Sequence, residues 1–99
     1  MAKAKVLSED ELAAALSSLE GWSVADGKLT RSYLFPDFPT AIAFVNKVAE
    51  IAERRVHHPF ISIDYKRVTL RLVTWHSGGI TELDISSARA YDQSRSELL

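Results

Sequence analysis

The fold is decided by the stretch "ERRVHHPFISIDYKRVTLRLV" at positions 53–73, which joins a helix to a pair of strands. In the segment before it, apolar residues recur at helical spacing, and this predicts a helix over residues 40–57. Pro59 disfavours helical backbone at His58, so the helix is expected to end at about His57. The stretch therefore starts as the last turn of a helix and continues as extended chain.

Two alternating segments follow the proline, at residues 60–65 and 68–76. Alternation of apolar and polar side chains is typical of strands with one buried face, and a tight turn is expected around Lys66 and Arg67. One face of the second segment carries Val68, Leu70 and Leu72. The opposite face could meet solvent, a ligand or another subunit, and it carries Thr69, Arg71, Val73 and Trp75.

The segments before position 40 predict a short helix and a hairpin. Ser8 and Glu11 have the spacing of a capping box at a helix start, and Gly21 is expected to end that helix. An Asp-Gly pair then lies between two short runs at 22–25 and 28–35. This arrangement is a strong hairpin signal.

A last helix is expected after the glycine pair at positions 78–79. Thr81 has the character of an N-cap, and Asp84 stands three residues later as its capping-box partner. The predicted order is helix, strand, strand, helix, strand, strand, helix. We expect one α+β domain over residues 1–99, with a four-stranded antiparallel sheet and the helices packed on one of its faces. An unpaired sheet edge favours a homo-oligomer.

Composition limits the kinds of partner. Twelve Lys and Arg against thirteen Asp and Glu give a net charge of −1, so neither nucleic acid nor an anionic membrane is expected as a partner. The chain has no cysteine, which removes disulfides and thiolate chemistry and suits a reducing compartment such as the cytoplasm. No run approaches the roughly 20 apolar residues that span a bilayer.

The adjacent histidines at the helix end are the candidate site. On a helix, Glu53 would lie beside His57, four residues later, and would favour its protonated form. From the residues alone the pair could be a helix-end surface contact, an acid–base device or a metal site. A metal would need further ligands, and only His76 and carboxylates are at hand, so no metal is predicted.

A longer pattern resembles the signature of the pterin-4a-carbinolamine dehydratase family. It consists of Glu53, three residues, His57-His58-Pro59, five residues, Tyr65, nine residues, Trp75, eight residues and Asp84. The segment "GGITELD" is similar to a stretch common in that family, and the resemblance covers roughly residues 22–91. It includes the predicted order of helices and strands.

The resemblance implies a lyase that dehydrates 4a-hydroxytetrahydropterin to the quinonoid dihydropterin, in tetrahydrobiopterin recycling. The pterin would be the substrate, with no cofactor, and the assembly a homodimer or homotetramer. By position in the motif, the implied catalytic residues are His57, His58 and Glu53, with His57 as the general acid/base oriented by Glu53. The residues implied in substrate binding are Trp75, His76 and Asp84.

The third site position raises a question of orientation. Better-known members of the family have a histidine where this chain has Trp75, and His76 is one residue later. On a regular strand these two side chains would point to opposite faces. Either the indole stacks on the pterin, or a bend brings His76 to the site. The alternative to catalysis that the resemblance implies is a binding module, because some members stabilise dimers of a homeodomain transcription factor.

Overall fold

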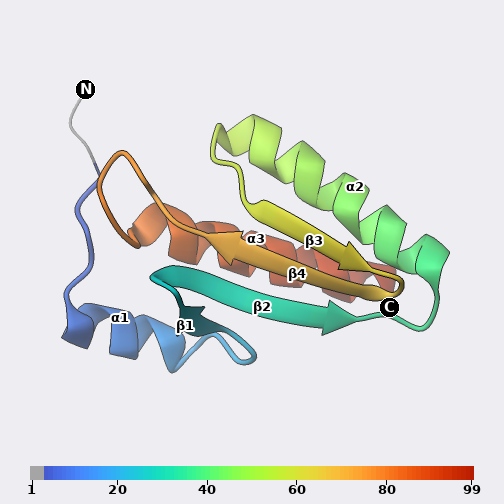
Figure 1. The fold of residues 1–99 in the computed structure, drawn as a ribbon, viewed down its shortest axis with the longest axis horizontal. Coiled ribbons are helices and arrows are strands. Elements are labelled where there is room, and N and C mark those ends of the chain that lie inside the picture. The colour runs from blue at the N-terminus through green and yellow to red at the C-terminus, as the bar shows by residue number, and fades with distance from the viewer. Residues whose placement is uncertain (1–3) are drawn as a thin grey trace.

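The order of the elements matches the prediction. A computed structural model describes residues 4–99, and these form three helices and a four-stranded antiparallel sheet in an α+β domain (Figure 1). Residues 1–3 of the predicted domain lie outside the described part. The helices are α1 (Glu9–Leu16), α2 (Phe38–Arg55) and α3 (Glu82–Leu98). The strands are β1 (Ser23–Ala25), β2 (Lys28–Leu34), β3 (Phe60–Asp64) and β4 (Arg67–Leu72).

The sheet has the order β1-β2-β4-β3, so the two longest strands are central. Tyr33 pairs with Val68, and Leu29 pairs with Leu72, which places all four side chains on the face that α2 and α3 cover (Figure 1). The opposite face is polar in its centre, where the hydroxyls of Ser32 and Thr69 lie 2.8 Å apart. One face therefore builds the core and the other stays open.

Two elements, α2 and β4, have boundaries that differ from the prediction. The helix expected over 40–57 is α2, and it begins earlier because the Asp37 side chain accepts the Thr40 N–H at 2.8 Å and caps it. It ends at Arg55 because Val56 adopts left-handed backbone, with φ of 52°. The last strand was expected to reach position 76, but β4 ends at Leu72.

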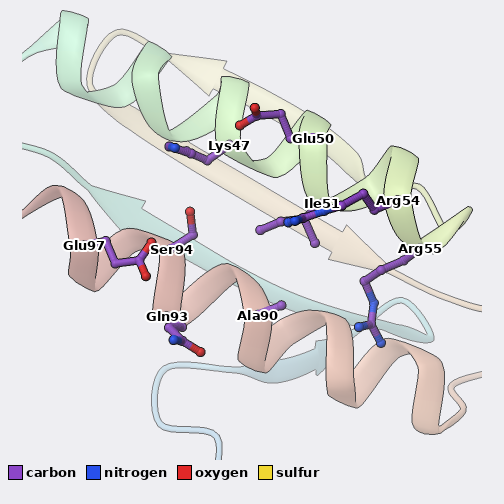
Figure 2. A pocket seen from close by; sticks show the side chains of 9 residues that line it. All are labelled: Lys47, Glu50, Ile51, Arg54, Arg55, Ala90, Gln93, Ser94 and Glu97. Carbon is purple, nitrogen blue, oxygen red and sulfur yellow. The ribbon is translucent and has the colours of Figure 1, made fainter.

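Helices α2 and α3 lie side by side and enclose an open groove of about 820 Å³ (Figure 2). Charges of both signs line it, with Lys47, Glu50 and Arg54 on α2 and Glu97 on α3. No helix of residues 4–99 is long and apolar enough to cross a membrane.

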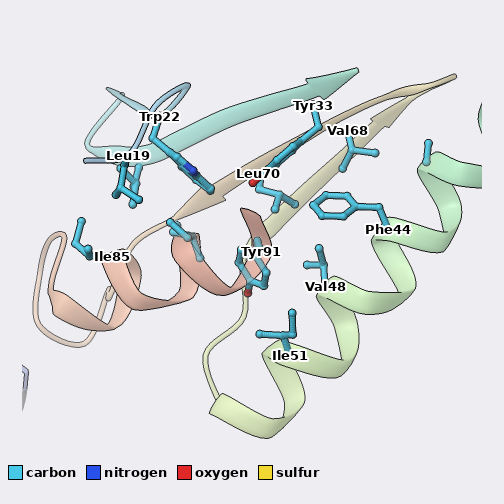
Figure 3. Packing of buried hydrophobic residues seen from close by; sticks show 14 of the residues in the cluster. Leu19, Trp22, Tyr33, Phe44, Val48, Ile51, Val68, Leu70, Ile85 and Tyr91 are labelled. Atoms are coloured by element: carbon cyan, nitrogen blue, oxygen red, sulfur yellow. The ribbon is translucent and has the colours of Figure 1, made fainter. Parts of the chain in front are cut away.

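The core lies between the sheet and the two long helices (Figure 3). Tyr33 and Phe44 pack with ring centroids 4.7 Å apart, which joins β2 to α2. From α3, Ile85, Ala88 and Tyr91 are fully buried on the same side. These three residues form the buried apolar stripe of α3.

Asp92 on α3 connects that helix to the first hairpin. Its carboxylate accepts hydrogen bonds from Trp22 Nε1 at 2.9 Å, Arg31 Nη1 at 2.9 Å and the Tyr33 hydroxyl at 2.5 Å. Burial, reinforced by Asp92, raises the pKa of Tyr33 well above its usual range. Tyr33 therefore stays neutral and donates its proton.

Tyr91 is also buried, but unlike Tyr33 it has no partner for its hydroxyl among residues 4–99. Burial raises the pKa of Tyr91 to about 12. An exposed tyrosine titrates near 10 in the unfolded chain, so ionisation of Tyr91 favours the unfolded state above about pH 10. The free energy of unfolding should therefore fall as the pH rises from about 10 toward 12.

The two tyrosines should respond oppositely to loss of the hydroxyl. Tyr33→Phe should lower the free energy of unfolding by about 1.5–3 kcal/mol, because a hydrogen bond to a charged group is lost. Tyr91→Phe should raise the free energy of unfolding by about 1 kcal/mol at neutral pH, because an unpaired polar group is removed. The free energy of unfolding should also fall less above pH 10 in this variant, because the titrating hydroxyl is gone. Urea unfolding at pH 7 and pH 11 measures both. Equal destabilisation by the two changes would contradict this account of Tyr91.

Candidate functional site

The site is organised by a sharp bend at the end of α2. Val56 is the C-cap, with φ of 52° and ψ of 44°, and its side chain is 80% exposed. The His57 N–H reaches back to the Ala52 carbonyl at 3.1 Å, which closes the helix end in a left-handed cap. β-branched residues rarely adopt this conformation. The bend takes His57 off the helix surface.

His57 pairs with a buried carboxylate on the neighbouring helix. Its Nε2 lies 2.6 Å from Asp84 Oδ1, with the His57 side chain 12% exposed and that of Asp84 fully buried. Such short contacts are typical of hydrogen bonds to a charged group. The pair joins the end of α2 to the first turn of α3.

Asp84 is also held from its other oxygen. Oδ2 accepts the Thr81 backbone N–H at 2.9 Å, which confirms the predicted capping box of α3. The Thr74 hydroxyl donates to the same oxygen, also at 2.9 Å, and lies 2.8 Å from the Thr81 hydroxyl. The carboxylate is thus held by three donors from separate segments of the chain.

His58 forms a second pair, close to solvent. Its Nε2 lies 2.6 Å from Glu53 Oε2, and these side chains are 58% and 77% exposed. The expectation that Glu53 pairs with His57 is therefore wrong. The predicted spacing requires both residues to lie on one helix, and the left-handed turn at Val56 breaks that relation. Glu53 instead meets the next histidine.

Arg55 fastens the end of α2 to α3 beside these pairs. Its guanidinium donates to the Ser87 hydroxyl at 3.1 Å and also contacts Ser86. The bend at Val56 is therefore flanked by two connections to α3, one from Arg55 and one from His57. The sequence had no signal for this role of Arg55, because it depends on how the two helices pack.

Trp75 and His76 lie in the turn between β4 and α3. The turn is closed by the Thr74 N–H, which donates to the Gly79 carbonyl at 3.0 Å. Both side chains are exposed, Trp75 by 77%, and their rings lie 4.7 Å apart at an angle of 36°. They are not on a regular strand, so the expected alternation of faces does not apply. Within residues 4–99, no hydrogen bond joins either ring to His57 or His58.

The groups brought together here suit proton transfer better than metal binding. Among residues 4–99 no cluster of three potential metal-ligating side chains is found. Neither histidine lines the groove between α2 and α3. Imidazoles held by carboxylates are common acid–base groups near neutral pH.

Comparison with known proteins gives a consistent family. The family model described as "Pterin 4 alpha carbinolamine dehydratase" matches residues 5–94. A protein of Mycobacterium sp. (strain KMS), provisionally named a pterin-4-alpha-carbinolamine dehydratase, is 50% identical over 88 residues, 89% of this chain and 94% of its own. One from Sulfurisphaera tokodaii with the same provisional name is 39% identical, covering 90% of this chain and 96% of its own.

Solved structures share this fold. A Brucella melitensis protein described as a transcriptional coactivator/pterin dehydratase superposes with a TM-score of 0.88 at 41% identity, covering 92% of this chain and 99% of its own. A pterin dehydratase-like protein described as a RuBisCO assembly factor in the alpha-carboxysome has a TM-score of 0.62 at 20% identity. It covers 75% of this chain and 86% of its own, and it shares the fold.

Proposed function

Because the chain belongs to the pterin-4a-carbinolamine dehydratase family, we propose that it dehydrates 4a-hydroxytetrahydropterin to the quinonoid dihydropterin. The observation that carries the proposal is the pair of adjacent imidazoles, each hydrogen-bonded to a carboxylate at 2.6 Å. This activity would serve recycling of a tetrahydrobiopterin-type cofactor. We place it in the cytoplasm, because a cysteine-free chain suits a reducing compartment.

The reaction needs one proton donor and one proton acceptor. The bond between the ring carbon and its hydroxyl breaks, and the leaving oxygen takes a proton to become water. A proton leaves the ring nitrogen as the carbon–nitrogen double bond forms. The oxidation state of the pterin does not change, so the proposal requires neither a metal nor a redox cofactor. Two histidines near neutral pH can serve both proton transfers.

We assign the principal acid–base role to His57, because its partner is fully buried and its ring is well held. His58 and Glu53 are more exposed and would bind or polarise the pterin from the solvent side. The carboxylate that orients His57 in this scheme is Asp84, in place of the expected Glu53. Asp84 is thus a positioning residue and would not touch the substrate.

Removal of either imidazole tests the proposal. We expect His57→Ala to lower kcat by about 10²–10⁴-fold, the usual contribution of a positioned acid or base, and His58→Ala to have a smaller effect. The measurement is dehydration of enzymatically generated 4a-hydroxytetrahydropterin by purified protein. Glu50→Ala, an exposed carboxylate change elsewhere on α2, is the control and should leave activity unchanged. Wild-type activity no higher than that of the double histidine variant would exclude the dehydratase assignment.

Variants of Trp75 and His76 distinguish two ways in which the turn after β4 could bind the pterin. If the exposed indole of Trp75 stacks on the ring, Trp75→Ala should raise KM by about tenfold, in line with aromatic stacking worth about 1 kcal/mol or more, while Trp75→Phe should retain most binding. His76→Ala should then change little. The reverse order, with kcat falling only in His76→Ala, would assign the third catalytic position to His76.

A non-catalytic binding module is the second candidate. It is favoured by the name of the Brucella relative, which joins coactivator and dehydratase, and by the high exposure of Trp75. A binding module should form a stable complex with a dimeric homeodomain protein, whether or not the histidines are present. The double histidine variant therefore separates the candidates, because it should lose only dehydration.

Self-association is the further part of the proposal. β3 is an edge strand with half-exposed apolar residues, including Ile61 at 38% and Ile63 at 42%, and such an edge can pair with a second copy. Light scattering should give a dimer or tetramer for the wild type and a smaller species for Ile63→Lys. Val24→Lys is the matched control, because Val24 is also 42% exposed but lies on the other edge strand, β1. A wild-type monomer at micromolar concentration would contradict the proposal.

A further inference from the structure

The hydrogen bonds around Asp84 form a chain whose direction can be assigned. An ionised carboxylate only accepts, so the Thr74 hydroxyl must donate a hydrogen bond to Asp84 Oδ2, 2.9 Å away. A threonine hydroxyl has one proton, so Thr74 cannot also donate to Thr81. The Thr81 hydroxyl, 2.8 Å away, must then donate to Thr74.

The first hydrogen bond of this series agrees with the assigned direction. The Thr81 hydroxyl accepts the backbone N–H of Leu83 at 3.2 Å, which leaves its own proton free for Thr74. The order of donation is therefore Leu83 to Thr81, Thr81 to Thr74, and Thr74 to Asp84. Thr74, Thr81 and Asp84 are all buried, at 6%, 0% and 0% exposure, so water does not readily replace these bonds.

The hydrogen bonds of the Asp84 carboxylate determine which ring nitrogen of His57 carries the proton. Both hydrogen bonds to Asp84 Oδ2 are donated by the protein, and Oδ1 faces His57 Nε2 at 2.6 Å. With Asp84 ionised, Oδ1 can only accept, so Nε2 must carry the proton. A neutral imidazole has one N–H, so Nδ1 has a free lone pair. No hydrogen bond to Nδ1 occurs within the described residues 4–99.

From this geometry we infer that Thr74 is a positioning residue, which holds Asp84 so that neutral His57 is the Nε2–H tautomer and exchanges protons through Nδ1. The tautomer follows from these hydrogen bonds when Asp84 is ionised and accepts at both oxygens. The statement that Nδ1 acts on the substrate rests on the proposed dehydratase function. The same assignment does not extend to His58, because its partner Glu53 is 77% exposed to water.

The tautomer is read directly by nitrogen-15 NMR of the histidine rings. In the wild-type protein at a pH where His57 is neutral, Nε2 should give the signal of a protonated ring nitrogen and Nδ1 that of an unprotonated one. The opposite assignment would overturn the inference. This measurement needs no substrate, no activity and no variant beyond those used to assign the His57 signals.

Thr74 variants test the role of the hydroxyl. Thr74→Val removes the donor with little change of shape, and it should give a mixture of the two His57 tautomers and lower kcat by about 10–100-fold, with a smaller change in KM. Thr74→Ser retains the hydroxyl, so it should keep the wild-type tautomer of His57 and the wild-type kcat. Thr69→Val is the matched control: its hydroxyl also pairs with another hydroxyl at 2.8 Å, but on the open face of the sheet, so the ring signals and kcat should not change.

The outcomes for the two proposals can be told apart. A protein that never dehydrates the pterin but has the Nε2–H tautomer, and loses it in Thr74→Val, fails the proposed function and retains the positioning role. A dehydratase whose His57 signals and kcat are the same in Thr74→Val as in the wild type overturns the positioning role and keeps the function. If Thr74→Val does not fold, Thr74→Ala, which also lacks the hydroxyl, takes its place in these comparisons.

Discussion

The buried carboxylate of Asp84 is the constraint on which the arrangement of the site depends. A charge removed from water is tolerated only when it is well paired, and removal of one partner from such a group is strongly destabilising. Asp84 meets this requirement with donors from the end of α2, the turn after β4 and the start of α3. These segments therefore have to converge, and the histidine pair is placed by the same contacts that satisfy the charge.

Most of the fold could be predicted because its signals are local. The capping boxes at Ser8 and Thr81 act within one helical turn, and alternation in β4 acts between neighbouring residues. The boundaries were less accurate where a local rule was overridden. Val56 has no sequence signal for left-handed backbone, since β-branched residues disfavour it, and so the helix was expected to run two residues too far.

For the site, the motif spacing named candidate residues but did not predict their hydrogen-bond partners. Glu53 and His57 fit a helical pair in sequence, yet hydrogen bonding follows the direction of the chain after Val56, which only the folded structure defines. Asp84 was expected to bind the pterin, and in the structure its carboxylate is fully buried and pairs with His57. Thr74 could not be found at all, because an isolated threonine before a turn is common and its importance arises from residues seven and ten positions later.

The left-handed residue at the end of α2 also affects how the site moves. Left-handed backbone costs roughly 1–2 kcal/mol for a residue with a side chain, and the side chain of Val56 is too exposed to recover this by packing. The bend is held instead by the contacts on either side of it, from Arg55 and His57 to α3. Once the bond between His57 and Asp84 opens, strain at Val56 favours relaxation of the loop. The last turn of α2 and the loop before β3 should therefore open together as one local unfolding unit, with amide exchange faster there than in the central strands.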